Sequence, residues 1–307
     1  MMLKNHRQLL GRFFLTLAVI VLAAVTGLQA AERVELQRDG LTHVAHLEMA
    51  PGRSMDDGVI LMLHGTMAHG RMEIMETLQG LLAERGYNSL SINLSLGIDA
   101  REGMMDCAAD HVHRHEDALA ELNAWMGWLR DQGAGRVALL AHSRGGAQMA
   151  WYVAEYAPEG VEKMVLVAPA THDHAQIARA YESNYGVPLS GVHGEAERLL
   201  NEGRPDTLIE DIGFLYCPDA RASAAAVASY YADNPNFDTP TLLSKVDLEV
   251  LVIAGSEDTT VADLPERMEP LKGKAHIHYD VVDGADHFFR DFFADDAADL
   301  AADFIGW

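Results

Sequence analysis

One segment near the middle of the chain constrains its fold more than any other. Residues 137–141, Val-Ala-Leu-Leu-Ala, have the length and composition of a buried β-strand. Ser143 follows this run, and residues 144–156 then show a helical pattern. A serine at so sharp a strand-to-helix turn needs strained backbone, so its neighbours two positions away must be small, as Ala141 and Gly145 are. The segment predicts a serine hydroxyl beside a helix N-terminus that favours negative charge; the alternative is a serine that only caps the helix.

The first 30 residues have the composition of a secretory signal peptide. Lys4, Arg7 and Arg12 precede an apolar run at 13–25, and Leu28-Gln29-Ala30 offers a cleavage site. This run is short for a membrane span, which needs about 20 residues, although an uncleaved N-terminal anchor is the alternative. We therefore expect a periplasmic or secreted protein with no stable membrane association after cleavage.

The charge of the chain excludes one class of partner. Lys and Arg number 23 and Asp and Glu number 46, for a formal net charge of −23. Loss of residues 1–30 removes three positive charges and no negative one, so the mature chain becomes still more acidic. Such a surface repels nucleic acid and anionic lipid, so we expect a small-molecule substrate and no nucleic-acid partner.

Strand and helix patterns alternate along most of the chain. Residues 32–48 read as a hairpin of edge strands, and the expected strands that follow, some of them continuous apolar runs such as 59–63, are separated by helical stretches. This alternation predicts an α/β fold with a mainly parallel, doubly wound sheet covered on both faces. The expected later strands are 59–63, 87–94, 137–141, 164–167, 250–254 and 275–281.

The alternation stops between residues 171 and 244. This segment shows helical patches and scattered tyrosines but no strong strand pattern. We interpret it as a helical cap, or lid, inserted into a core made of residues 31–170 and 245–307.

Two later residues are candidates for the base and the acid that a serine nucleophile needs. A serine hydroxyl becomes a good nucleophile when a base takes its proton, and the base needs an acid to orient it. Asp258 follows the strand expected at 250–254, with Glu257 as the alternative acid, and His287 follows the strand expected at 275–281. The sequence therefore predicts Ser143 as nucleophile, His287 as base and Asp258 as the orienting acid.

The order Ser143, Asp258, His287 resembles that of the α/β-hydrolase superfamily. Four short motifs carry the resemblance: His64-Gly65, Ala-His-Ser-Arg-Gly at the serine, Gly-Ser-Glu-Asp at the acid and Gly-Ala-Asp-His at the base. The resemblance implies an oxyanion hole formed by the backbone N–H groups of Arg144 and Thr66, with Met67 as the neighbouring candidate.

The same resemblance implies hydrolysis through an acyl-enzyme without a cofactor. An ester of a small or medium acyl group is the expected substrate, as for a carboxylesterase or lipase, because alcohols leave more readily than amines. Amide or peptide hydrolysis and acyl transfer on the same triad are alternatives within enzymes. From another class, the chain could be a non-catalytic binding module on a hydrolase scaffold.

Three histidines alternate in the loop after the strand expected at 87–94. His111, His113 and His115 lie among carboxylates, so a metal site is one hypothesis. A serine mechanism requires no metal, and loops at this edge of the sheet surround the pocket in such folds. We therefore expect these histidines to line the pocket and to contact substrate or cap residues, and we expect His64 to contact substrate.

The chain has two cysteines, Cys107 and Cys217. Cys107 lies in the histidine-rich loop and Cys217 in the expected cap, so a disulfide would join the two regions. Both a disulfide and two free thiols fit the sequence, because spacing alone does not show whether the geometry permits a bond.

Overall fold

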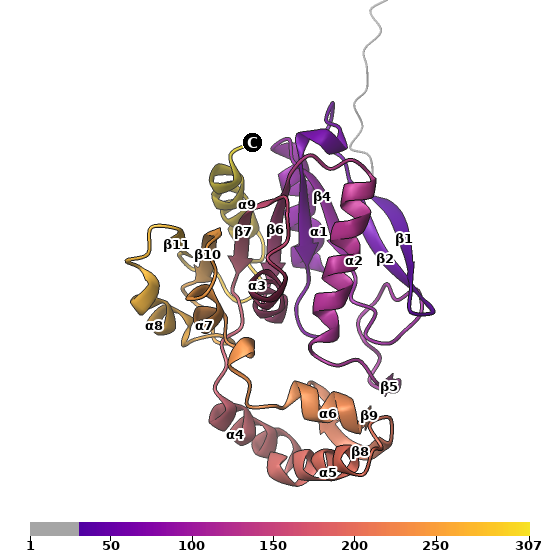
Figure 1. Ribbon diagram of the computed structural model, residues 1–307. Coiled ribbons are helices and arrows are strands. Elements are labelled where there is room, and N and C mark those ends of the chain that lie inside the picture. Colours follow the sequence, from indigo (N-terminus) through magenta and orange to yellow (C-terminus); the bar gives the residue numbers. More distant parts are fainter. Residues whose placement is uncertain (1–30) are drawn as a thin grey trace, which may run out of the picture.

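The computed structural model describes residues 31–307; the expected signal peptide lies outside the described residues. Its centre is an eight-stranded sheet with the strand order β1-β2-β4-β3-β6-β7-β10-β11 (Figure 1). The strands from β4 to β11 run parallel, whereas β1 and β2 form the expected hairpin and β2 pairs antiparallel with β4. The mainly parallel sheet is thus confirmed. The strands are β1 Glu32–Arg38, β2 Leu41–Glu48, β3 Val59–Leu63, β4 Asn88–Ile92, β6 Val137–His142, β7 Val161–Val167, β10 Glu249–Gly255 and β11 Ile277–Val282.

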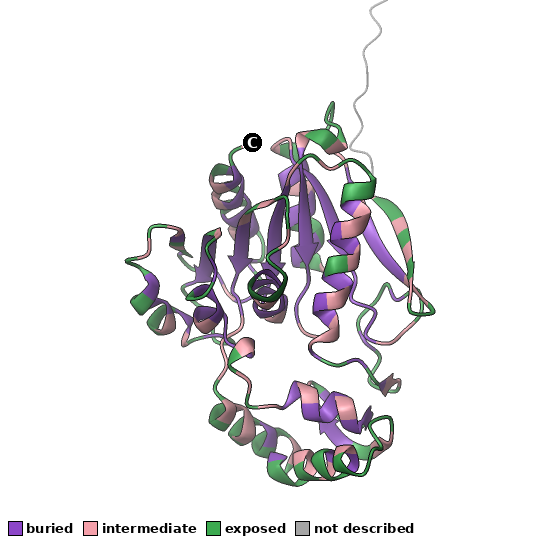
Figure 2. Cartoon of the chain, in the orientation of Figure 1, coloured by how far each residue is buried: buried purple, intermediate pink, exposed green. Residues whose placement is uncertain are grey.

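Helices cover both faces of this sheet. Helix α2 (Asp117–Asp131) packs with α3 (Arg144–Tyr156), and α1 (Glu73–Glu84) packs with α9 (Phe292–Ile305). Every residue of β3, β4 and β6 is buried, as expected for central strands covered twice (Figure 2). No helix within residues 31–307 is both long and apolar enough to cross a membrane. The shorter helices are η1 Met55–Asp57, η2 Pro235–Phe237, α7 Thr239–Leu243, α8 Leu264–Met268 and η3 Glu269–Leu271.

The cap contains strands as well as the expected helices. Its helices are α4 (His174–Tyr185), α5 (Leu189–Asn201) and α6 (Ala224–Tyr230). The expectation that residues 171–244 lack a strand is wrong, because β8 (Leu208–Phe214) pairs antiparallel with β9 (Cys217–Ser223).

These cap strands gave no clear signal in the sequence. Pro218 lacks an N–H for a strand ladder, and β9 is otherwise rich in alanine, which is depleted in strands. Pairing comes from the tertiary structure instead: β9 also pairs with β5 (Asp110–His111), in the histidine-rich loop of the core.

A disulfide adds a covalent link between the same two regions. Cys107 is bonded to Cys217, at a sequence separation of 110 residues. The open question about the cysteines is thus resolved in favour of a bond. The cap is tied to the core beside the loop that carries the three histidines.

Candidate active site

Ser143 occupies the turn between β6 and α3 in strained backbone. Its φ of 56° and ψ of −127° lie outside the regions that non-glycine residues favour. The turn fits only because its neighbours are small: a Cβ added to Gly145 would lie 2.3 Å from the carbonyl oxygen of His64. Gly146 is equally confined, because its Cβ would lie 2.7 Å from the Cβ of Pro169. The close packing holds the serine against the loop after β3.

The structure brings the three expected triad residues together. His287 Nε2 lies 2.9 Å from Ser143 Oγ, and His287 Nδ1 lies 2.8 Å from Asp258 Oδ2. A carboxylate can only accept, so Nδ1 carries a proton and, in the neutral imidazole, Nε2 is free to accept from the serine hydroxyl. Glu257, the alternative acid, is exposed to solvent.

Asp258 is held in its charged form. Burial alone would raise the pKa of this carboxyl group, but hydrogen bonds from His287 and from the backbone N–H groups of Val261 and Thr260 outweigh burial and lower it. Oδ1 accepts the two backbone N–H groups at 3.1 and 2.7 Å, which leaves Oδ2 for the imidazole. A fixed negative charge therefore faces Nδ1 of His287.

His142 is a positioning residue that the sequence did not single out. Its Nε2 donates to the carbonyl oxygen of His287 at 2.8 Å, and the two rings lie 4.9 Å apart. Burial, and then the proximity of His287, lowers the pKa of His142 to about 4. A neutral imidazole thus fixes the backbone of the catalytic-base candidate without adding a competing positive charge.

The expected oxyanion loop lies against the serine. A Cβ added to Gly65 would be 3.1 Å from Ser143 Cβ, and Met67 adopts a positive φ of 56° in the turn that follows. Arg144 Nε donates to Thr66 Oγ1 at 2.9 Å, which joins the first residue of α3 to this loop. The roles of the Thr66, Met67 and Arg144 N–H groups in an oxyanion hole stay a prediction.

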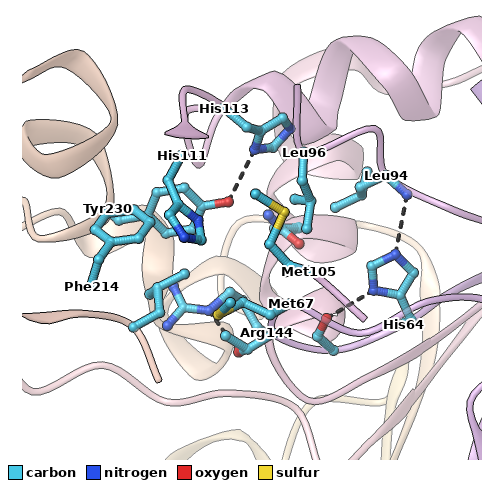
Figure 3. Close-up of a pocket in the computed structure, with 14 residues that line it drawn as sticks. His64, Met67, Leu94, Leu96, Met105, His111, His113, Arg144, Phe214 and Tyr230 are labelled. Atoms are coloured by element: carbon cyan, nitrogen blue, oxygen red, sulfur yellow. Dashed lines mark hydrogen bonds between the residues drawn. The ribbon is translucent and has the colours of Figure 1, made fainter. Parts of the chain in front are cut away.

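Two adjoining hollows meet at this loop. One contains Ser143 and His287, and apolar side chains from the cap and the core surround it: Met72, Met104, Tyr216 and Phe288. The other, shown in Figure 3, lies between core and cap and contains Arg144. Gly65 and Thr66 line both hollows.

Two of the three loop histidines face the second hollow. His111 and His113 line it, and His113 Nδ1 lies 3.0 Å from the hydroxyl of Tyr230 on cap helix α6 (Figure 3). His115 does not line it, because its ring stacks on Tyr230 and packs edge-on against Phe237. Of the two expected partners, substrate and cap, His115 therefore contacts the cap, and strand geometry in this loop extends only through Asp110–His111.

His64 lines the same hollow, but its ring has a structural task. Nδ1 donates to the carbonyl oxygen of Gly65 at 2.8 Å, and Nε2 accepts from the backbone N–H of Leu94 at 3.1 Å. Burial, followed by the nearby Arg101, lowers the pKa of His64 to about 3. Both ring nitrogens thus hold loops together and leave none for a substrate.

The histidine-rich loop is also the region for which the sequence offers a metal site as a hypothesis. In the part of the chain that the structure describes, no group of three or more His, Cys, Asp or Glu side chains is arranged to hold a metal ion. His113 instead faces Glu121, with 3.5 Å between Nε2 and Oε1.

The sequence did not identify the cap residues that shape the site. Tyr230 and Phe214 line the second hollow from the cap, and Gln148 lines it from α3. Scattered tyrosines in 171–244 were the only signal, and they gave no contact partners. Only the folded cap shows which of them face the core.

The fold and this site define a family. The chain belongs to the alpha/beta hydrolase family, whose sequence profile matches residues 60–303. No curated protein matches the sequence.

Several solved structures share the fold. Est1E from Butyrivibrio proteoclasticus is 16% identical over 90% of this chain and 99% of its own, with a TM-score of 0.63. Monoacylglycerol lipase from Paleococcus ferrophilus is 16% identical over 85% of this chain and 99% of its own, with a TM-score of 0.58. An esterase domain from Rhodothermus marinus is 14% identical over 91% and 97%, with a TM-score of 0.56. At such identities the likeness shows the fold alone.

Proposed function

We propose that this protein is a serine esterase that works through an acyl-enzyme. The observation that carries the proposal is the continuous path of hydrogen-bonding distances from Ser143 Oγ through His287 to Asp258, 2.9 and 2.8 Å long. Such a path lets the imidazole take the serine proton as the hydroxyl attacks a carbonyl carbon.

The proposed reaction has two halves. Ser143 Oγ forms a bond to the acyl carbon while His287 takes its proton, and the developing oxyanion accepts hydrogen bonds from the N–H groups of Arg144 and Thr66 or Met67. The bond to the alcohol then breaks, and His287 returns the proton to the leaving oxygen. In the second half, water attacks the acyl-enzyme by the same route and releases the acid.

An ester is the proposed substrate bond. Alcohols are better leaving groups than amines, and the structural neighbours include proteins described as an esterase and a lipase. Amide hydrolysis and acyl transfer use the same three side chains, so they are tested beside ester hydrolysis. The acyl group is proposed to be small or medium in size.

A fluorophosphonate probe followed by a substrate panel tests the proposal. We expect the probe to label the wild type and not Ser143→Ala, and we expect matched esters to be cleaved faster than the corresponding amides. A folded wild-type protein that is neither labelled nor active would contradict catalysis and support a binding module. Labelling with faster amide than ester cleavage would reassign the substrate bond.

We also propose that the mature protein acts in the periplasm or outside the cell on a small molecule. The composition of residues 1–30 supports this proposal, and so does the disulfide, because disulfides persist in oxidising compartments. Detection of the chain in a periplasmic or medium fraction, starting after Ala30, would test it; a cytoplasmic chain that retains residues 1–30 would contradict it.

A further inference from the structure

The side chain next to the proposed nucleophile extends into the hollow between core and cap. The Arg144 guanidinium lines this cavity, with its Nε donating to Thr66 Oγ1 at 2.9 Å (Figure 3). The ring of Tyr230 lies 5.5 Å from its central carbon, so the guanidinium also makes a cation–π contact. Two contacts thus fix its plane and leave its two terminal nitrogens for another partner.

No such partner is present among the described residues. No hydrogen bond or ion pair within residues 31–307 uses the terminal nitrogens of Arg144, although that part of the chain holds all 46 of its acidic residues. The cavity wall contains no Asp or Glu. Arginine stays charged in proteins, and a half-buried charge without a counterion is unfavourable.

The other side chains of the cavity wall do not neutralise the positive charge of Arg144. Burial lowers the pKa values of both His64 and His111, so both are neutral near pH 7. His113, the third histidine of the wall, faces Glu121, and among the described residues Arg144 is the one Lys or Arg side chain that lines the cavity. His111 Nε2 is buried without a hydrogen-bond partner and offers a second polar atom to a ligand. The rest of the wall is largely apolar, with Leu94, Leu96, Met105 and Phe214.

We propose that this cavity binds a carboxylate at the far end of the acyl group, so that the substrates are half-esters of dicarboxylic acids. The inference rests on the proposed esterase function. The planar fork of arginine matches a carboxylate with two parallel hydrogen bonds. One cation balances one negative charge; a phosphate, with up to two charges, would leave charge unpaired against apolar walls.

The position of His287 assigns the cavity to the acyl side. His287 must reach the oxygen of the departing alcohol, and it lies in the hollow with Ser143, Thr260 and Phe288. The cavity of Arg144 does not include His287. The alcohol therefore leaves on the side of His287, and the acyl chain extends past Thr66 toward Arg144.

Matched ethyl esters test the proposal. Monoethyl glutarate carries the carboxylate, and ethyl 4-carbamoylbutanoate replaces it with a neutral amide of the same shape; monoethyl succinate and adipate vary the chain length. Each reaction releases ethanol, which takes its proton from His287, and water then frees the dicarboxylic acid or its monoamide. We expect wild-type kcat/KM to be at least about 10-fold higher for the best half-ester than for its amide, since hydrogen bonds to charged groups have effects of this size.

For each variant, the quantity to compare is the ratio of kcat/KM for the half-ester to kcat/KM for its amide. A general loss of activity would leave this ratio unchanged. Arg144→Met should bring this ratio close to one, and Arg144→Lys should keep part of it. Arg179→Met removes the same charge from an exposed position on cap helix α4 and should preserve the ratio. A wild-type ratio of one or less, an unchanged ratio in Arg144→Met, or an equal loss in Arg179→Met would overturn the proposal.

A binding measurement separates this proposal from the esterase proposal. We expect calorimetry to show monoethyl glutarate binding to Ser143→Ala at least about 10-fold more tightly than to the Ser143→Ala/Arg144→Met double variant. Binding with this dependence but no wild-type turnover would support the carboxylate site and refute only esterase activity. Rapid turnover of neutral esters without this dependence would do the reverse.

Discussion

The core and the cap contribute to the site in different ways. The core supplies Ser143, Asp258 and His287 from backbone turns at the ends of parallel strands, where close contacts fix the chain. The cap supplies side chains such as Tyr230, which line the cavity. A disulfide, a short strand pair and aromatic packing hold the cap against the core. The difference teaches that the triad geometry depends on rigid backbone turns of the core, whereas the contribution of the cap to the pocket depends on contacts between segments far apart in the sequence.

The largest expected effect tests this division directly. His287→Ala should lower kcat by at least about 10³-fold without unfolding the protein, because the triad acts as a unit. Tyr230→Phe, which removes only the hydroxyl that lies 3.0 Å from His113, should alter KM for the preferred ester by less than about 10-fold. Steady-state kinetics with circular dichroism as a folding control would measure both. Comparable losses of kcat in the two variants would break the division.

The disulfide tests how firmly the cap is held. Replacing Cys107 and Cys217 together with alanine should lower the free energy of unfolding by about 2–5 kcal/mol, because the bond closes a long loop. We expect KM to rise more than kcat falls, since the bond lies between cap and core. Urea unfolding and kinetics of the double variant and the untreated wild type would show this. A fall in kcat alone would place the effect in the core.

Acid should weaken the core through its neutral histidines. His142 has a pKa lowered to about 4 from 6.5, so the folded state binds fewer protons than the unfolded state between these values. Its contribution is complete above about pH 6.5 and is lost as the pH falls toward 4, on the order of 3 kcal/mol. Unfolding of the wild type and His142→Gln between pH 7 and 4.5 measures this slope. Parallel curves for the two proteins would exclude His142 as the cause.

The smallest expected effects on stability come from replacing two glycines with alanine, one in the core turn and one in the cap. Gly145→Ala should destabilise the protein by about 1–3 kcal/mol, because the new methyl group meets the backbone of His64. Gly194→Ala on cap helix α5 enters open space and should stabilise the protein by about 0.5–1 kcal/mol. Denaturant midpoints of the two variants give the comparison. Destabilisation by Gly194→Ala would show that the cap is as tightly packed there as the core turn.

The sequence predicted much of the core because its signals are local. The strands expected at 59–63, 137–141 and 250–254 are continuous apolar runs, and each triad residue follows an expected strand within a few positions. Parallel strands that end at one edge bring those residues together, so chain order and strand ends were enough to choose Ser143, Asp258 and His287. The distances in the structure agree with that choice of residues.

The cap and its contacts were less accessible to sequence reasoning. Strands β8 and β9 are stable through pairing with each other and with β5, a segment about 100 residues earlier in the chain. The position of the loop indicated that His115 lies near the pocket, but only the structure shows that its ring stacks on Tyr230 of the cap. The cap strands and the partner of His115 escaped sequence reasoning for one cause, since the deciding neighbours are distant in sequence.

What the sequence determined by itself is the parallel sheet, the strained serine turn and the order of three side chains along it. These follow from local apolar patterns, small residues and turns at strand ends. Only the tertiary structure decided that Cys107 meets Cys217, that His142 steadies the backbone of His287, and that Arg144 faces a cavity without an acidic partner. Such features depend on which distant segments fold against one another, and no local pattern of residues encodes that choice.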